Sequence, residues 1–73
     1  MTQYSQLQKF GKNVRKVRKA KDISQEQLVE LAGLHRNYTG GVERGERNVT
    51  LLNIILIAHA LGMSASKLLQ GLD

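Results

Sequence analysis

Residues 24–45 contain the pattern that most restricts how this chain can fold, because they predict two short helices separated by a tight turn. Ser24 suits the N-cap of the first helix, and Gln27 can return a hydrogen bond to it, which completes a capping box. Apolar residues then recur at helical spacing up to Gly33, which can adopt the left-handed conformation that ends a helix. The second helix is expected over residues 36–44, with its end at Gly45.

Two short helices joined by a glycine turn form a helix-turn-helix, in which the second helix enters the major groove of DNA. The charge of the chain agrees with a polyanionic partner. The net charge is +5 at pH 7, and seven of the eleven basic residues lie between Lys9 and Lys21 with no acidic residue among them. A basic helix alone is as often a solvated face, but beside a helix-turn-helix it favours binding to double-stranded DNA.

The rest of the sequence predicts three further helices and no strand, so we expect an all-α fold in one domain over residues 1–73. Residues 1–4 are expected to fray. Thr50 and Ser64 can cap the last two helices. The five expected helices span residues 5–21, 24–33, 36–44, 51–61 and 64–71.

Residues 51–61 are apolar around nearly the whole circumference of their helix, which is typical of a helix buried on all sides. A chain of 73 residues has too little protein to cover both sides of such a helix. We therefore expect residues 51–72 to join two subunits into a homodimer, unless the last helix folds over the second face and leaves a monomer. The expected interface residues are Ile55, Met63, Leu68, Leu69 and Leu72.

Several other classes of protein are disfavoured by composition. The chain has no cysteine, and its two histidines are too few for a metal cluster, so we expect no metal site and no cofactor. No arrangement of serine, histidine and aspartate has a spacing that suggests catalysis, so no enzyme activity is expected. The sequence has neither a membrane-spanning run nor a signal-peptide pattern, which indicates a cytoplasmic protein without membrane contact.

Four runs of residues carry a family resemblance: SQEQL from Ser24, AGLHRNY from Ala32, VERGERNVTL from Val42 and ALG from Ala60. They resemble the phage-repressor-type (Xre-like) helix-turn-helix family over about residues 8–70. Within that family, LHRNY and ERGERN are similar to the controller proteins of restriction–modification systems, which are small all-helical dimers. The resemblance implies a compact five-helix, lambda-repressor-like domain that regulates transcription from a palindromic operator.

The resemblance also implies roles for individual residues. Arg36 and Asn37 match positions that read bases, where arginine can pair with guanine and asparagine with adenine. Gln25 matches a glutamine that grips a phosphate and braces the second helix of the motif. Thr39 is included with the two base-reading residues. The residues expected on the DNA backbone are Ser24, Gln25, His35, Tyr38, Arg47 and Asn48.

Arg18 and Glu43 match a structural ion pair between helices, with direct DNA contact by Arg18 as the alternative. Two departures from the family pattern stand out. Thr39 replaces a branched apolar residue of the core, so its hydroxyl would need a partner. Gly40 and Gly41 each cost a helix about 1 kcal/mol relative to alanine. Either these glycines let DNA approach closely, with Gly41 at a position that often reads a base, or the helix is weakly formed until it binds.

Two other functions remain as alternatives to a DNA-binding regulator. An antitoxin-like or other protein-interaction subunit would use the apolar surface of residues 51–72 as its main binding site. A peripheral membrane protein would bind through the basic helix at residues 5–21, whose apolar stripe would then have to leave the core. Capture of a stoichiometric partner protein and binding to anionic vesicles are the observations that would favour these two functions.

Overall fold

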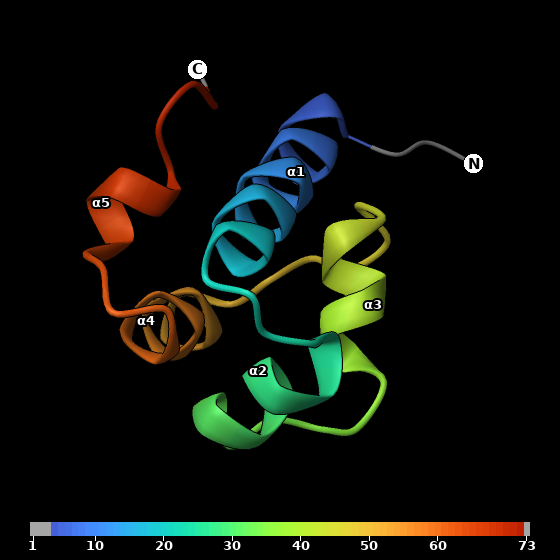
Figure 1. Cartoon of the computed structure of the whole chain (residues 1–73). Coiled ribbons are helices and arrows are strands. Elements are labelled where there is room, and N and C mark those ends of the chain that lie inside the picture. The colour runs from blue at the N-terminus through green and yellow to red at the C-terminus, as the bar shows by residue number, and fades with distance from the viewer. Residues whose placement is uncertain (1–3, 73) are drawn as a thin grey trace.

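Five helices follow one another along residues 4–72, the part of the chain that this computed structural model describes, and no strand occurs among them (Figure 1). This confirms the all-α prediction. Of the segment expected to fray, residues 1–3 lie outside the described residues. The helices are α1 (Ser5–Ala20), α2 (Gln25–Ala32), α3 (Tyr38–Glu43), α4 (Leu51–Ala60) and α5 (Ala65–Leu68).

Side-chain caps explain where α2, α4 and α5 begin. The Ser24 hydroxyl accepts a hydrogen bond from the Gln27 amide at 3.0 Å, and the Ser24 amide donates to the Gln27 side chain at 2.7 Å. The predicted capping box is therefore present. Thr50 and Ser64 cap α4 and α5 with their hydroxyls, which accept hydrogen bonds from the amides of Asn53 and Lys67. Gly33, with a φ of 69°, ends α2 in the left-handed conformation.

The helix α3 begins two residues later than predicted. The amide of Tyr38 donates to the carbonyl of His35 at 3.0 Å, so a turn at residues 36–37 precedes the first helical residue. Asn37 makes no side-chain cap. Arg36 and Asn37 consequently lie at the exposed entrance to α3 rather than within it.

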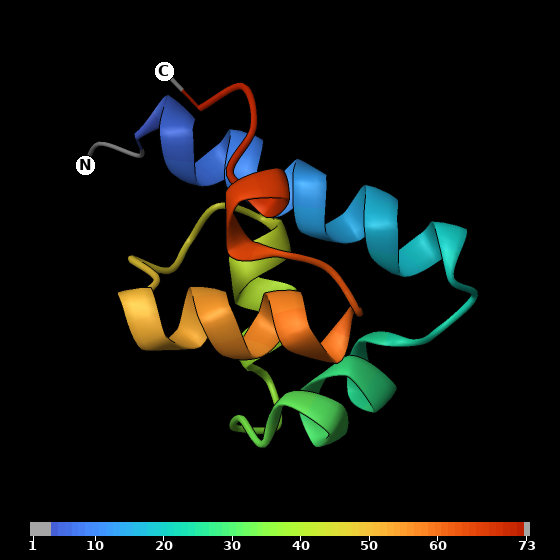
Figure 2. The ribbon, with the colours of Figure 1, turned by 90° about the vertical axis from the view of Figure 1, so that its left-hand side faces the viewer.

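The core lies between α1, α2, α3 and α4, with α5 closing one side. Pairs of helices pack as α1 on α3 and α2 on α4, while α3 and α5 lie on opposite sides of α1 (Figures 1 and 2). Among residues 4–72, no helix is both long and apolar enough to cross a membrane. The buried cluster consists of Phe10, Val14, Leu28, Val42, Ile57, Ala58, Leu61 and Leu68.

Gly11, a core position that the sequence did not indicate, lets α1 approach the end of α3. A Cβ atom at Gly11 would lie 2.6 Å from the carbonyl oxygen of Glu43 and would also collide with the carbonyl oxygen of Val42. Both obstacles are backbone atoms, which cannot rotate away as a side chain can. The close packing of α1 on α3 therefore needs glycine here, despite the cost of glycine within a helix.

The placement of α5 corrects one predicted interface residue. Leu68 is 0% exposed and belongs to the core, so it is not available to a second subunit. The Asn13 side chain holds this region on α1, because its amide donates to the carbonyls of Leu68 and Gln70 at 2.9 and 3.0 Å. The other four predicted interface residues are half-buried: Ile55, Met63, Leu69 and Leu72.

The exposed apolar surface of α4 lies instead at its N-terminal end. Leu51 and Leu52 are 71% and 64% exposed, and neither was among the predicted interface residues. An apolar helix does not reveal from its own sequence which of its faces will be covered. The covered face of α4 depends on where α2 and α5 pack against it.

Candidate DNA-binding surface

Two adjacent hollows mark the surface around the start of α3. One of about 440 Å³ lies toward α2, and one of about 320 Å³ lies toward the loop after α3. Arg36 and Asn37 border both hollows, and these two residues are exposed. The first hollow is lined by Gln25, Glu26, Arg36, Asn37, Gly40 and Arg44. The second is lined by His35, Arg36, Asn37, Tyr38 and Arg47.

The structure thus brings six of the predicted DNA-contacting residues to one surface. Ser24 and Asn48 do not line either hollow, although both are exposed. Arg44 lines the first hollow and was missed, although it lies four residues after Gly40 and so on the same helical face. Arginine side chains on both hollows make this surface suited to an anionic partner.

Arg18 and Glu43 form the predicted ion pair between α1 and α3. The Arg18 Nε atom lies 2.6 Å from Glu43 Oε2, and a second nitrogen donates to Oε1 at 3.1 Å. A third donates to the carbonyl of Ile23 at 2.8 Å. The two side chains are only 11% and 4% exposed, and the hydrogen bond to Glu43 raises the pKa of Arg18. This geometry supports a structural role for Arg18 and leaves its guanidinium committed within the protein.

Gln25 connects the start of α2 to the same ion pair. Its side-chain amide donates to Glu43 Oε1 at 3.0 Å, so Glu43 receives hydrogen bonds from both α1 and α2. The first turn of α2 also has backbone N–H groups that favour an anion. This arrangement braces α3 against α2, as the resemblance implies, and leaves Gln25 beside the hollow.

Thr39 was wrongly included among the base-reading residues. It is 1% exposed, because it lies on the side of α3 that packs against α1 and α2. A side chain in that position cannot reach a base. Among residues 4–72, its hydroxyl Oγ1 has no hydrogen-bond partner, which is the unfavourable result expected of threonine at this position.

Thr39→Val is expected to raise the free energy of unfolding by about 1–2 kcal/mol. Valine keeps the branched shape while removing a buried hydroxyl that lacks a partner. Urea unfolding of the two proteins measures the difference. Thr39→Ser, which keeps the hydroxyl and loses a methyl group, is the control and should be less stable than the natural protein. Equal or lower stability of the valine variant would show that the hydroxyl is satisfied in solution.

Gly41 is buried, which argues against the base-reading position that the family pattern suggests for it. A Cβ atom at Gly41 would lie 2.9 Å from Arg47 Nε and 3.0 Å from Arg47 Cγ. The Arg47 side chain therefore crosses α3 at the glycine, and its guanidinium lies 5.7 Å from the centre of the Tyr38 ring. The Tyr38 hydroxyl accepts a hydrogen bond from the Asn53 side chain at 3.1 Å, which links this group to α4.

Gly40 and Arg44 shape the other side of α3. A Cβ atom at Gly40 would meet only the flexible end of Arg44 and the side chain of Gln25, at 3.1 and 3.4 Å. Arg44 pairs with Glu46 at 2.9 Å, and this hydrogen bond lowers the pKa of the Glu46 carboxyl. The pair is exposed, so the Arg44 guanidinium can exchange Glu46 for another anion.

Comparison with known proteins relates this arrangement to a described family. The family model described as "Helix-turn-helix" matches residues 14–68. The control protein C.SmaI of Serratia marcescens is 57% identical over 65 residues, which are 86% of this chain and 77% of that protein. The control protein C.BamHI of Bacillus amyloliquefaciens is 48% identical over 62 residues, 84% of this chain and 76% of that protein.

A solved structure shows the same fold. The restriction-modification controller protein C.AhdI from Aeromonas hydrophila superposes with a TM-score of 0.87 and is 52% identical. The match covers 89% of this chain and 98% of that protein. Similarity in sequence and similarity in fold therefore extend over similar shares of this chain.

Proposed function

This chain belongs to the helix-turn-helix family and is a DNA-binding transcriptional regulator, and we propose that it controls a restriction–modification system as a homodimer on a palindromic operator. The observation that carries the proposal is an identity of 48–57% with two control proteins over more than four-fifths of the chain. The matched proteins are control proteins rather than enzymes, and we propose no catalytic role here. The cytoplasm is the proposed location because the DNA target lies there.

In the proposed complex, the entrance to α3 lies in the major groove. Arg36 and Asn37 read bases, since both are exposed at the point where the two hollows meet. Gly40 supports this placement, because the absence of a side chain lets DNA approach the backbone of α3. The residues proposed to hold the sugar–phosphate backbone are Ser24, Gln25, His35, Tyr38, Arg44, Arg47 and Asn48.

The homodimer is proposed to form around the N-terminal end of α4. Leu51 and Leu52 are adjacent and mostly exposed, and Ile55 lies one turn further along the same helix. Adjacent exposed leucines on a small domain are typical of an interface between proteins. A symmetric pair of chains would place two recognition helices on half-sites about 34–36 Å apart, one turn of the duplex.

Leu52→Glu is expected to convert the dimer to a monomer at micromolar concentration, because it would bury a carboxylate against apolar side chains of the partner. Sedimentation velocity measures the change, with circular dichroism to verify that the helices remain. The matched control is Leu31→Glu on α2, since Leu31 is 63% exposed and should leave the dimer intact. A natural protein that sediments as a monomer would contradict the proposed dimer.

Selection from a randomised duplex library, at a fixed and roughly physiological salt concentration, tests the proposed function as a whole. A recovered palindrome with the expected half-site spacing would support a dimeric regulator and supply its operator. Retention of DNA without sequence enrichment would leave only phosphate-driven binding. That result would contradict sequence-specific regulation and favour the protein-interaction alternative.

A further inference from the structure

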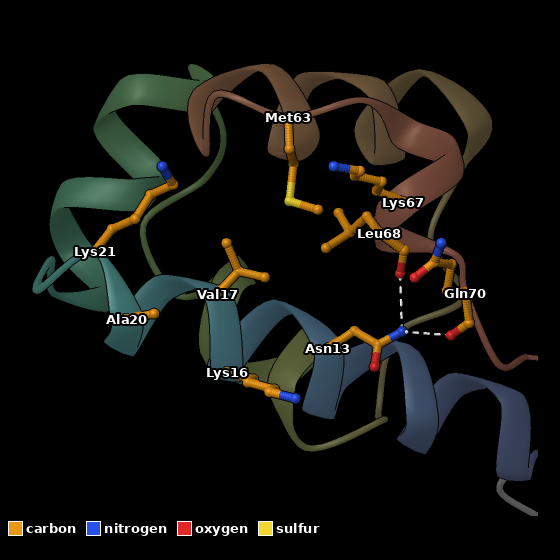
Figure 3. A pocket seen from close by; sticks show the side chains of 9 residues that line it. All are labelled: Asn13, Lys16, Val17, Ala20, Lys21, Met63, Lys67, Leu68 and Gln70. Atoms are coloured by element: carbon orange, nitrogen blue, oxygen red, sulfur yellow. Dashed lines mark hydrogen bonds between the residues drawn. The ribbon is translucent and has the colours of Figure 1, made fainter.

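A groove of about 610 Å³ separates the C-terminal half of α1 from α5 and the loop before it. Val17 and Met63 point toward each other across it, and Leu68 lies beside them on the side of Asn13 (Figure 3). At one end, the two hydrogen bonds from Asn13 to the carbonyls of Leu68 and Gln70 bridge the helices. The groove therefore has an apolar floor and a polar bridge at one end.

The charge around this groove has a single sign. Lys16 lines it from α1, Lys21 from the C-cap of α1, and Lys67 from α5. None of the nine residues that line it is acidic. The ion pairs of the described residues, Arg18 with Glu43 and Arg44 with Glu46, involve none of the three lysines. An occupant with a negative charge would therefore have three lysine residues and no carboxylate around it.

We propose that this groove binds a small amphiphilic anion, whose apolar body lies on Val17, Met63 and Leu68 and whose carboxylate or phosphate head group contacts the lysines. A volume of about 610 Å³ falls in the range of small-molecule sites, about 300–1,000 Å³. The bridge at Asn13 obstructs one end, which fits a short ligand better than a helix running through the groove. The flexible thioether of Met63 can adjust to apolar groups of different shape.

The position of the groove makes this site separate from the DNA-binding surface. The groove lies on the α5 side of α1, whereas α3 packs on the opposite side (Figures 1 and 2). No residue lines both this groove and either hollow at the start of α3. A ligand here would leave Arg36 and Asn37 free for DNA, so it would be an effector rather than a competitor.

Titration of the full chain with octanoate, octyl phosphate and neutral 1-octanol, followed by ¹H–¹⁵N NMR spectra, tests the proposal. The two anions are expected to shift the amides of residues 16–21 and 63–70 and to bind about tenfold more tightly than the alcohol, since three exposed ion pairs each contribute modestly. Comparison of octanoate with octyl phosphate distinguishes a carboxylate from a phosphate ligand. Equal affinity for alcohol and anions, or shifts centred on Leu51 and Leu52, would overturn the proposal.

A triple variant examines the lysines directly. Replacement of Lys16, Lys21 and Lys67 by glutamine is expected to weaken anion binding about tenfold, to the level of the alcohol. The matched control replaces Lys9, Lys12 and Lys19 by glutamine, which removes the same charge from positions of α1 outside the groove. Equal weakening in both triple variants would show a general charge effect and overturn the assigned site. Neither titration involves DNA, so failure here leaves the proposed regulatory function untouched.

Discussion

Glu43→Ala is expected to lower the free energy of unfolding by about 3–5 kcal/mol, because it leaves the Arg18 guanidinium largely buried without its counter-ion. Glu43 also accepts the hydrogen bond from Gln25, so the substitution removes side-chain hydrogen bonds that join α3 to both α1 and α2. For a domain of this size, whose total stability is roughly 4–11 kcal/mol, such a loss would remove about a quarter or more of that stability.

Urea unfolding at 25 °C measures this effect against two other variants. Glu46→Ala removes an acidic residue from the exposed pair with Arg44 and should unfold close to the natural protein. The double variant Arg18→Met with Glu43→Leu should recover much of the lost stability, since apolar residues can replace a buried ion pair at little cost. If Glu43→Ala were no less stable than Glu46→Ala, the prediction would be wrong. Such a result would mean that water solvates the Arg18 guanidinium although this side chain is only 11% exposed.

Local patterns and family resemblance predicted much of this molecule correctly. The capping box at Ser24, the turn at Gly33 and the ion pair of Arg18 with Glu43 each depend on a few residues whose geometry recurs wherever they occur together. These features position the surface at the start of α3. The roles of Arg36 and Asn37 in reading bases stay predictions, because the structure shows only that both are exposed there.

The errors came from features that depend on packing between helices. The family pattern already has an apolar core residue at the position of Thr39, and the packing of α3 against α1 and α2 buries that side chain. Leu68 could not be assigned from sequence either, because α4 is apolar all round and does not indicate where α5 will fold. The backbone contact at Gly11 joins residues far apart in the chain, so no local pattern signals it.

Arg36→Ala is expected to weaken binding to the selected operator by about 30-fold to about 10⁴-fold. A bidentate contact between arginine and guanine contributes about 1–3 kcal/mol, and a homodimer on a palindrome makes it twice, for about 2–6 kcal/mol. Binding to unrelated DNA should fall much less, because it depends on the whole set of phosphate contacts. Fluorescence anisotropy with operator and scrambled duplexes at one salt concentration separates the two quantities.

The matched control is Lys9→Ala, which removes the same charge at a residue beside Gly71, away from the start of α3. It should reduce operator and scrambled binding by similar small factors, as expected of a change in net charge alone. Repeating the library selection with Arg36→Ala should relax the preference at one base pair in each half-site. If the recovered palindrome keeps every position, the base-reading role passes to Asn37 and Arg44, which border the same hollow. Loss of base preference at one base pair in each half-site, at two positions related by the two-fold symmetry of the operator, would assign Arg36 to that base pair in both subunits.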